Sequence, residues 1–555
     1  MRVLLSAMGL EVRSMHSAAY LLALFALFSQ LLALVRDRLF AGTFGASHTL
    51  DLYFAAFRLP DFLFATVASL LSLYALLPVL SRLEERQAGL GIAFLRNSLL
   101  YFFVAMAVVC GVAFVLAPQI LALVAPGLAG PDLLLMTRIL LLQPILLGAS
   151  NILANLTQLR HRFVLYSISP LLYNLGIILG VVFLYPRFGF AGLAWGVVLG
   201  ALLHFAVQAP FFFGEHTEAR VPFLESLRYV REVLLLSIPR TLALAANQIS
   251  LLVLTALASL LSVGSISIFM LAWNLQAVPL TIIGVSYSVA AFPTLSRLYA
   301  GGHSGEFAAH VLGALRHIIF WAVPATVLII VLRAQLVRVI LGSGAFDWSA
   351  TRLVAAALAL LILSLLAQSV SLLIARAYYA AGNSRKPFMF GLVDLVVSVV
   401  TAVLLVSLFH SSEFLRHFIE ALLRVTDIPG STVLMLALGL ALGSIAEFVV
   451  AYRMFVRDFE LKGEGLGRLA FQSFAAGVLG GACAYGALTL MGFYVDINTV
   501  FGIVSQGFVG GVVGLVGCVL VLLVLKNPEL QEVWGALSRR AAQAPTVLEP
   551  TDVSS

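Results

Sequence analysis

Charged residues are scarce in this chain, which has 555 residues of which 11% are Asp, Glu, Lys or Arg and 61% are hydrophobic. A typical soluble domain carries about 25% charged residues. The longest polar interruptions, at 215–232, 411–430 and 453–468, are too short to bury a core of their own. This composition excludes a soluble enzyme or binding domain and predicts an all-α polytopic membrane protein.

Other absences exclude further classes of protein. Lysine is rare, and the arginines that supply most of the 33 basic residues are scattered between apolar segments, so we expect no nucleic-acid partner. The three cysteines, Cys110, Cys483 and Cys518, lie singly in apolar runs, which argues against a disulfide framework or a metal site. No HExxH, GxSxG or Walker A pattern occurs. We therefore expect neither an enzyme nor a resident cofactor, and any transport must draw on an ion gradient, the membrane potential or the substrate's own gradient.

Long apolar runs are what the chain does contain. Because roughly 20 apolar residues cross the hydrocarbon core of a bilayer, we predict about 14 transmembrane helices. They lie near 18–36, 52–80, 97–117, 134–157, 163–185, 190–213, 233–261, 266–292, 318–340, 353–376, 388–409, 432–452, 469–491 and 499–525. The first run is too long for the core of a cleavable signal peptide. Loops after even-numbered spans carry most of the Lys and Arg, so both termini, including a tail over 527–555, are predicted to be cytoplasmic.

A short motif repeats along the chain. Pro78 to Leu83 (PVLSRL) follows the second span, and Pro293 to Leu298 (PTLSRL) follows the eighth, in the same topological position. Six spans of separation preserve orientation, so we predict two pseudo-symmetric six-helix lobes at 1–215 and 216–460, with spans 13 and 14 (461–526) appended. Chance recurrence of a helix-end motif is the alternative. Two such lobes would enclose a central cavity and work as a secondary transporter by alternating access.

Ionisable residues cluster around the first two spans, where they are costly unless they face a wet cavity or a partner. The cluster consists of Arg36, Asp37, Arg38, Asp51, Arg58 and Asp61. Arg58 and Asp61 lie three residues apart and can pair on one helix face. For Arg58 the alternatives are this structural pair and a cation offered to an anionic headgroup. For Arg36, Asp37 and Arg38 the alternative is a helix end whose side chains reach back to the interface.

The second predicted lobe carries polar residues inside its spans. Asn247 lies in span seven, Asn274 and Gln276 in span eight and Asp394 in span eleven. Ordinary interhelical hydrogen bonding explains amides of this kind. A buried carboxylate must be protonated, paired or bound to a cation. Asp394 is therefore a candidate coupling-ion site for Na⁺ or H⁺, with Asn247 beside it; pairing with Arg376 or Arg240 is the alternative.

The residues between 36 and 60 resemble the N-terminal signature of the MurJ/MviN family of lipid II flippases, in the multidrug/oligosaccharidyl-lipid/polysaccharide exporter superfamily. The matching positions are Arg36-Asp37, Phe44-Gly45-Ala46, Asp51 and Ala55 to Pro60, and further agreement lies at Asn247 to Ser250, Pro293 to Leu298, Gly344 to Phe346 and Ala377 to Pro387. Several positions that carry arginine or an acidic residue in the family differ here: they are Gln30, Phe64, Ala65, Asn274 and Ser69.

The resemblance implies a fourteen-helix protein of the bacterial inner membrane, and a monomer is the default for this architecture. It would move an undecaprenyl-pyrophosphate-linked peptidoglycan precursor, a lipid II-like molecule, from the cytoplasmic to the outer leaflet, with the precursor and membrane lipids as its partners. The resemblance also implies roles for site residues. Arg36 and Arg58 would engage the phosphates of the headgroup, and Asp37 and Asp51 would act as a gate or pair with these arginines. Asn274 and Gln276 would contact polar headgroup atoms. The alternatives are an exporter of another lipid-linked glycan or amphipathic molecule, and a non-transporting scaffold for envelope assembly.

Overall fold

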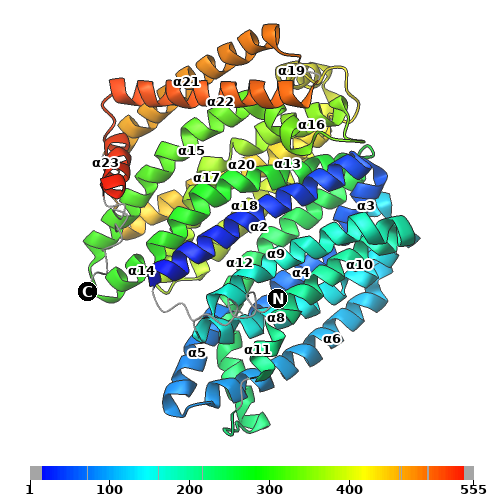
Figure 1. Ribbon diagram of the computed structural model, residues 1–555, viewed down its shortest axis with the longest axis vertical. Helices are drawn as coiled ribbons and strands as arrows, with labels where there is room; N and C mark the ends of the chain where they lie inside the picture. Colours follow the sequence, from blue (N-terminus) through cyan, green and yellow to red (C-terminus); the bar gives the residue numbers. More distant parts are fainter. Residues whose placement is uncertain are drawn as a thin grey trace, which may run out of the picture. The chain divides into compact units, whose positions relative to one another are not determined.

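The structure is a computed structural model that describes residues 15–542, apart from positions 72, 161, 215–216, 462, 464 and 497–498. Every regular element in that part of the chain is helical, which confirms the all-α prediction (Figure 1). The last part of the predicted tail, 543–555, lies outside the described residues. The helices are α2 (Met15–Phe44), α3 (His48–Ala56), α4 (Arg58–Thr66), η1 (Ala68–Leu71), α5 (Leu73–Arg86), α6 (Leu90–Val124), η2 (Pro126–Leu128), α7 (Pro131–Leu140), α8 (Leu142–Leu159), α9 (Phe163–Leu179), η3 (Gly180–Leu184), α10 (Tyr185–Ala206), α11 (Ala209–Gly214), α12 (Phe223–Ser259), α13 (Ser265–Leu280), η4 (Thr281–Val285), α14 (Ser286–Ala300), α15 (Ser304–Leu341), α16 (Trp348–Ile362), α17 (Leu365–Ala380), α18 (Arg385–Ser411), α19 (Glu413–Leu423), α20 (Val433–Phe459), α21 (Leu466–Tyr494), α22 (Val500–Val524) and α23 (Pro528–Ala542).

Ten helices of the described chain are long and apolar enough to cross a membrane, and the bent pair α16 and α17 would make an eleventh. One of the ten, Phe163–Gly214, covers two predicted spans because α9, η3 and α10 follow one another without a loop. The predicted first span falls on α2, and the second falls on a broken helix. The number fourteen stays a prediction, while the multi-pass membrane architecture is clear.

Prolines interrupt the second and eighth predicted spans. The ring of a proline clashes with the carbonyl four residues earlier, which for Pro60 belongs to Ala56. Helix α3 ends at Ala56, and α4 begins at Arg58 on the far side of Phe57. Pro279 lies at the end of α13, and the chain passes through the π-helical turn η4 before α14 begins. Broken helices of this kind place irregular backbone next to polar cavities in membrane proteins.

The helices pack into two compact units that interleave along the chain. The first contains residues 1–278, 337–364 and 382–451, and the second contains residues 279–336, 365–381 and 452–555. The boundary after Val278 falls at Pro279, in the last turn of α13, and the boundary after Ser364 coincides with the bend between α16 and α17. These units group residues by packing, and the division into lobes at 215 and 460 stays a prediction.

Within the first unit, glycines bring α9 and α10 together backbone to backbone. A Cβ atom added at Gly176 would lie 2.2 Å from the Cα atom of Gly200, and one added at Gly180 would lie 2.5 Å from the Cα atom of Gly196. Small residues spaced four apart on both helices are the usual means of close helix approach in a bilayer. This packing fixes α9, which carries one wall of the site described below.

In the first unit, loops that the predicted topology places on the same side of the membrane contact each other. The backbone N–H of Ala345, in the loop after the predicted ninth span, donates to the carbonyl of Gly42, near the end of α2 (2.8 Å). On the other set of loops, the Thr217 hydroxyl donates to the carbonyl of Gly89 (3.2 Å), which joins the loops after the predicted sixth and second spans. Each of these contacts joins two loops that the predicted topology places on the same side of the membrane.

Candidate functional site

A polar cavity of about 210 Å³ lies in the first unit. Five helical segments contribute to it: α2, α3, α4, α9 and α13. The lining residues are Arg36, Asp37, Phe40, Tyr53, Phe54, Phe57, Arg58, Asp61, Tyr173, Ile177, Met270 and Asn274. Aromatic rings and four ionisable side chains therefore share one cavity, and the break between α3 and α4 places Phe57 and Arg58 at its wall.

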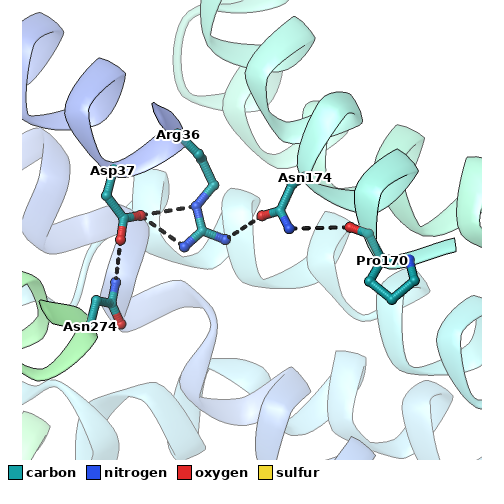
Figure 2. Close-up of polar contacts among 5 residues, drawn as sticks. All are labelled: Arg36, Asp37, Pro170, Asn174 and Asn274. Atoms are coloured by element: carbon teal, nitrogen blue, oxygen red, sulfur yellow. Dashed lines mark hydrogen bonds and ion pairs between the residues drawn. The ribbon is translucent and has the colours of Figure 1, made fainter. Parts of the chain in front are cut away.

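Arg36 is held by Asp37 on its own helix and by Asn174 on α9 (Figure 2). Its Nε and NH2 atoms donate to Oδ1 of Asp37 at 3.0 and 2.8 Å, and its NH1 donates to Oδ1 of Asn174 on α9 at 3.0 Å. The other carboxylate oxygen of Asp37 accepts a hydrogen bond from Nδ2 of Asn274 on α13 at 3.1 Å. Asn174 is itself oriented by donating to the carbonyl of Pro170 at 3.1 Å. Asp37 thus neutralises Arg36, and the network ties α2 to α9 and α13.

Arg58 is bound very differently. Its side chain is buried, with the residue only 5% exposed, yet its single hydrogen bond joins NH2 to the thioether sulfur of Met270 at 3.0 Å. Its Nε atom is buried without a hydrogen-bond partner. A thioether is a weak acceptor, and a buried cation is costly unless it is paired. Among the described residues Arg58 therefore has no anionic side chain within ion-pair distance, and Asp61, which lines the same cavity, interacts with it only at longer range.

The pairing of Arg58 with Asp61, one of the two alternatives for Arg58, is not a direct contact in the structure. No ion pair within 4.0 Å joins the two described side chains; Oδ1 of Asp61 instead accepts from Nε2 of Gln143 on α8 at 3.3 Å. Tyr53 and Tyr173 also line the cavity, and neither was among the residues singled out in the sequence. The nearby Asn174, flanked by Tyr173 and Pro170 in an apolar span, is the sequence signal that could have identified this wall.

Asp51 lies at the start of α3, away from the cavity, and binds the start of α13. Its Oδ2 accepts from the backbone N–H of Gly264 at 2.6 Å, and its Oδ1 accepts from the N–H and the hydroxyl of Ser267 at 2.7 and 2.6 Å. The residue is 3% exposed. A carboxylate at a helix N-terminus satisfies free N–H donors and interacts favourably with the helix dipole. Asp51 thus fastens α3 to α13 across more than 200 residues of sequence.

Two other expected residues lie outside the cavity. Gln276 is fully buried and is not among the lining residues. Arg38 donates from NH1 to the carbonyls of Val339 and Ile340 at 2.5 and 3.2 Å, at the end of α15. Arginine at this position satisfies carbonyls that lack partners within the helix. Arg38 therefore has a structural role.

Asp394 lies in α18, 8% exposed, and accepts hydrogen bonds at Oδ1 from the hydroxyls of Ser444 (3.1 Å) and Ser398 (3.4 Å). Glu447 on α20 is close enough to interact with it electrostatically. Asn247 is exposed on α12, which packs against α18, but it forms no hydrogen bond with Asp394. Among the described residues, no group of three or more His, Cys, Asp or Glu side chains could hold a metal ion.

Known protein families match the part of the chain that contains most of these residues. A family model described as "Lipid II flippase MurJ" matches residues 40–415, which include α3, α4, α9 and α13. The chain belongs to the lipid II flippase MurJ family. The lipid II flippase MurJ of Burkholderia cenocepacia is 28% identical over 391 residues, covering 67% of this chain and 75% of that protein. The probable lipid II flippase MurJ of Thermotoga maritima is 26% identical over 395 residues, covering 68% and 77%.

Solved structures support the same fold. A structure described as lipid II flippase MurJ in an inward closed conformation superposes with a TM-score of 0.69 at 20% identity, covering 92% of this chain and all of that one. An inward-facing MATE family transporter of the MOP superfamily gives a TM-score of 0.62 at 14% identity, covering 78% of this chain and 95% of that one. These structures therefore show the fold that the chain shares with them.

Proposed function

We propose that this protein flips a lipid-linked peptidoglycan precursor of the lipid II type from the cytoplasmic to the outer leaflet of the bacterial inner membrane. It works as a secondary-type transporter by alternating access, as a monomer with both termini in the cytoplasm. Membership of the MurJ family and the polar cavity of a multi-pass helical protein support this function. The headgroup would enter the cavity while the polyprenyl chain stays in the bilayer.

One observation carries the proposal: Arg58 is a buried guanidinium with no anionic partner in contact. A protein pays for such a charge in stability, so a ligand that supplies the counter-charge explains why it is kept. Phosphate oxygens match the fork of a guanidinium and form charge-assisted hydrogen bonds. The pyrophosphate of the precursor would therefore bind at Arg58.

Arg36 provides the second cation once a ligand competes with Asp37. In the structure its charge is neutralised at 2.8 Å by Asp37, and Asn274 holds the other oxygen of that carboxylate. An arriving phosphate would take over guanidinium N–H donors while Asp37 keeps its bond to Asn274. The aromatic rings of Tyr53 and Tyr173 offer sugar faces a flat apolar surface with hydroxyl groups at the rim. Selectivity for the headgroup of the precursor would thus depend on two cations and several aromatic residues.

Asp51 gates the pathway on the side opposite the termini. Its three hydrogen bonds hold the start of α3 against the start of α13, and they must break before those helix ends separate. Closure is then stable because one desolvated carboxylate satisfies three donors. Opening of this contact would release the headgroup to the outer leaflet.

Asp394 is the proposed coupling site, for Na⁺ or H⁺. The carboxylate is buried in α18, with two hydroxyl donors and the carboxyl of Glu447 near it. Two carboxylates at membrane depth favour binding of a proton or a cation between them, because like charges in a low dielectric repel strongly. The membrane potential would add about 2.3 kcal/mol per charge for each 100 mV crossed.

The function is tested by complementation of a bacterium depleted of its own lipid II flippase. Wild type should restore growth, Arg58→Ala and Arg36→Ala should fail at equal membrane levels, and Arg228→Ala, which removes an exposed arginine of α12, should behave as wild type. In proteoliposomes, wild type should make lipid II accessible to a membrane-impermeant reagent. Lack of rescue by a correctly inserted wild type would exclude lipid II and favour another lipid-linked glycan. Equal rescue by all three variants would show that flipping does not depend on Arg36 or Arg58, whereas a wild type that neither rescues growth nor moves any lipid-linked glycan would favour a scaffold.

A further inference from the structure

A second charged cavity lies in the other compact unit, far along the chain from the residues of the proposed flipping pathway. It has a volume of about 300 Å³ and is formed by α15, the start of α21 and the junction between α22 and α23. Its lining includes the cations Arg316, Arg468 and Lys526 and one carboxylate, Glu529. Three cations against one carboxylate make the cavity positively charged.

The floor of this cavity is rigid. Gln472 donates from Nε2 to the carbonyl of Leu525 at 3.0 Å and accepts at Oε1 from Nδ2 of Asn527 at 2.8 Å. Asn527 caps α23 by accepting at Oδ1 from the N–H of Leu530 at 3.0 Å. Gln472 and Asn527 are both buried. This network fixes the turn at Lys526, whose φ of 49° is in the left-handed region, and so fixes where the Lys526 side chain starts.

The charged side chains of this cavity differ in whether they have a partner. Arg316 directs Nε and NH2 to the same oxygen of Glu529, Oε1, both at 2.7 Å. The second oxygen, Oε2, is buried without a hydrogen-bond partner, in a residue that is 3% exposed. The side chains of Arg468 and Lys526 are exposed and form no hydrogen bond or ion pair with any described residue. The cavity therefore presents two cations without a described partner, next to the ion pair of Arg316 with Glu529.

The position of the cavity along the apolar helices determines how deep in the bilayer a ligand would bind. Helix α21 begins at Leu466 and α22 ends at Val524, so the cavity lies where two apolar spans end, at the level of lipid headgroups. Next to it, Phe471 is 67% and Val524 is 80% exposed on the spans themselves. Trp534 on α23 is 70% exposed, as expected for a helix that lies at the interface of the bilayer. Acyl chains can pack along these apolar side chains while a headgroup fills the cavity.

We propose that this cavity binds the headgroup of an anionic phospholipid of the phosphatidylglycerol type. Arg468 and Lys526 hold the phosphate beside the ion pair of Arg316 with Glu529. Basic pockets between membrane helices bind anionic headgroups in this way. The single negative charge of the headgroup matches the positive cavity. Phosphatidylcholine offers a phosphate but no net negative charge.

The test uses native mass spectrometry of the full-length protein, purified in a neutral detergent and incubated with equal amounts of phosphatidylglycerol and phosphatidylcholine of matched chain length. Wild type should retain one phosphatidylglycerol in preference. Because each charge-assisted hydrogen bond changes affinity by about tenfold or more, the double variant R468A/K526A should lose the preference. The matched control R220A/R228A removes two exposed arginines from the same predicted side of the membrane and should keep it.

Further arms separate the sources of the phosphate and the role of Glu529. Free glycerol 3-phosphate at millimolar concentration should not displace the lipid, because it lacks the contacts of the acyl chains; displacement would assign the site to a soluble phosphate and overturn the proposal. E529Q removes the one carboxylate of the lining and should retain phosphatidylglycerol at least as well as wild type, while its melting temperature reports whether the fold survives; loss of the lipid from a folded E529Q would overturn the proposal. Equal retention of both lipids by wild type, or an equal loss in the arginine control, would also overturn it.

Discussion

The contact between Asp51 and the start of α13 makes a quantitative prediction about gating. Ser267→Ala removes one of three hydrogen bonds to a buried carboxylate and leaves the two backbone donors of Gly264 and Ser267 in place. The change is small in volume and leaves the charge of Asp51 intact. It therefore weakens the closed contact without removing the partner that carries the charge.

The magnitude follows from the chemistry of the bond. A hydrogen bond to a charged group contributes about 1.5 to 3 kcal/mol, and about 1.4 kcal/mol changes an equilibrium tenfold. The population in which α3 and α13 are separated should therefore rise by about 10- to 150-fold in Ser267→Ala. Asp51→Ala removes all three bonds and should have a larger effect.

A cysteine reporter can measure this shift. Ser265 is fully buried at the start of α13, so Ser265→Cys, in a chain whose three native cysteines are replaced by alanine, should react slowly with a membrane-impermeant maleimide. Ser267→Ala should raise the labelling rate by the factor above. The matched control Ser167→Ala removes a buried hydroxyl of α9 that donates to the carbonyl of Phe163. Labelling that stays within about twofold of the parent, or that rises equally in the control, would refute the role of Asp51.

Three further predictions follow from single residues. Arg58→Met should raise the melting temperature in detergent, because a buried charge without an anionic partner is replaced by an apolar side chain, worth about 1 to 4 kcal/mol, while complementation is lost; a lower melting temperature would contradict this account. Gly264→Ala should destabilise the fold by about 1 to 3 kcal/mol because φ is +89° there and the new Cβ would lie 2.6 Å from a carbonyl oxygen, whereas Gly305→Ala, with nothing within 4 Å, should be tolerated. A hydrogen bond from Arg352 lowers the pKa of Asp427, in the loop before α20, below its ordinary value of 3.8. The difference in melting temperature between wild type and Asp427→Asn should be present at neutral pH and should disappear as the pH falls through that lowered pKa.

Two pairs of charged residues show which contacts of the site could be predicted from the sequence. Asp37 follows Arg36 directly, and their pairing was among the alternatives that the sequence offered. Arg58 and Asp61 share a turn of α4, yet Arg58 contacts Met270 on α13 and Asp61 contacts Gln143 on α8. Spacing on one helix shows which side chains can meet, whereas neighbouring helices decide which of them do.

The sequence by itself determined that this protein is an all-α membrane protein of the MurJ family. Hydrocarbon forces every backbone polar group to pair within its own segment, so long apolar runs predict helices without reference to the rest of the chain. Only the tertiary structure decided that Asp51 binds Gly264 and Ser267, 213 and 216 residues away, and that Arg58 is left without an anionic partner. Those outcomes depend on which helices become neighbours, and no local pattern of residues records that choice.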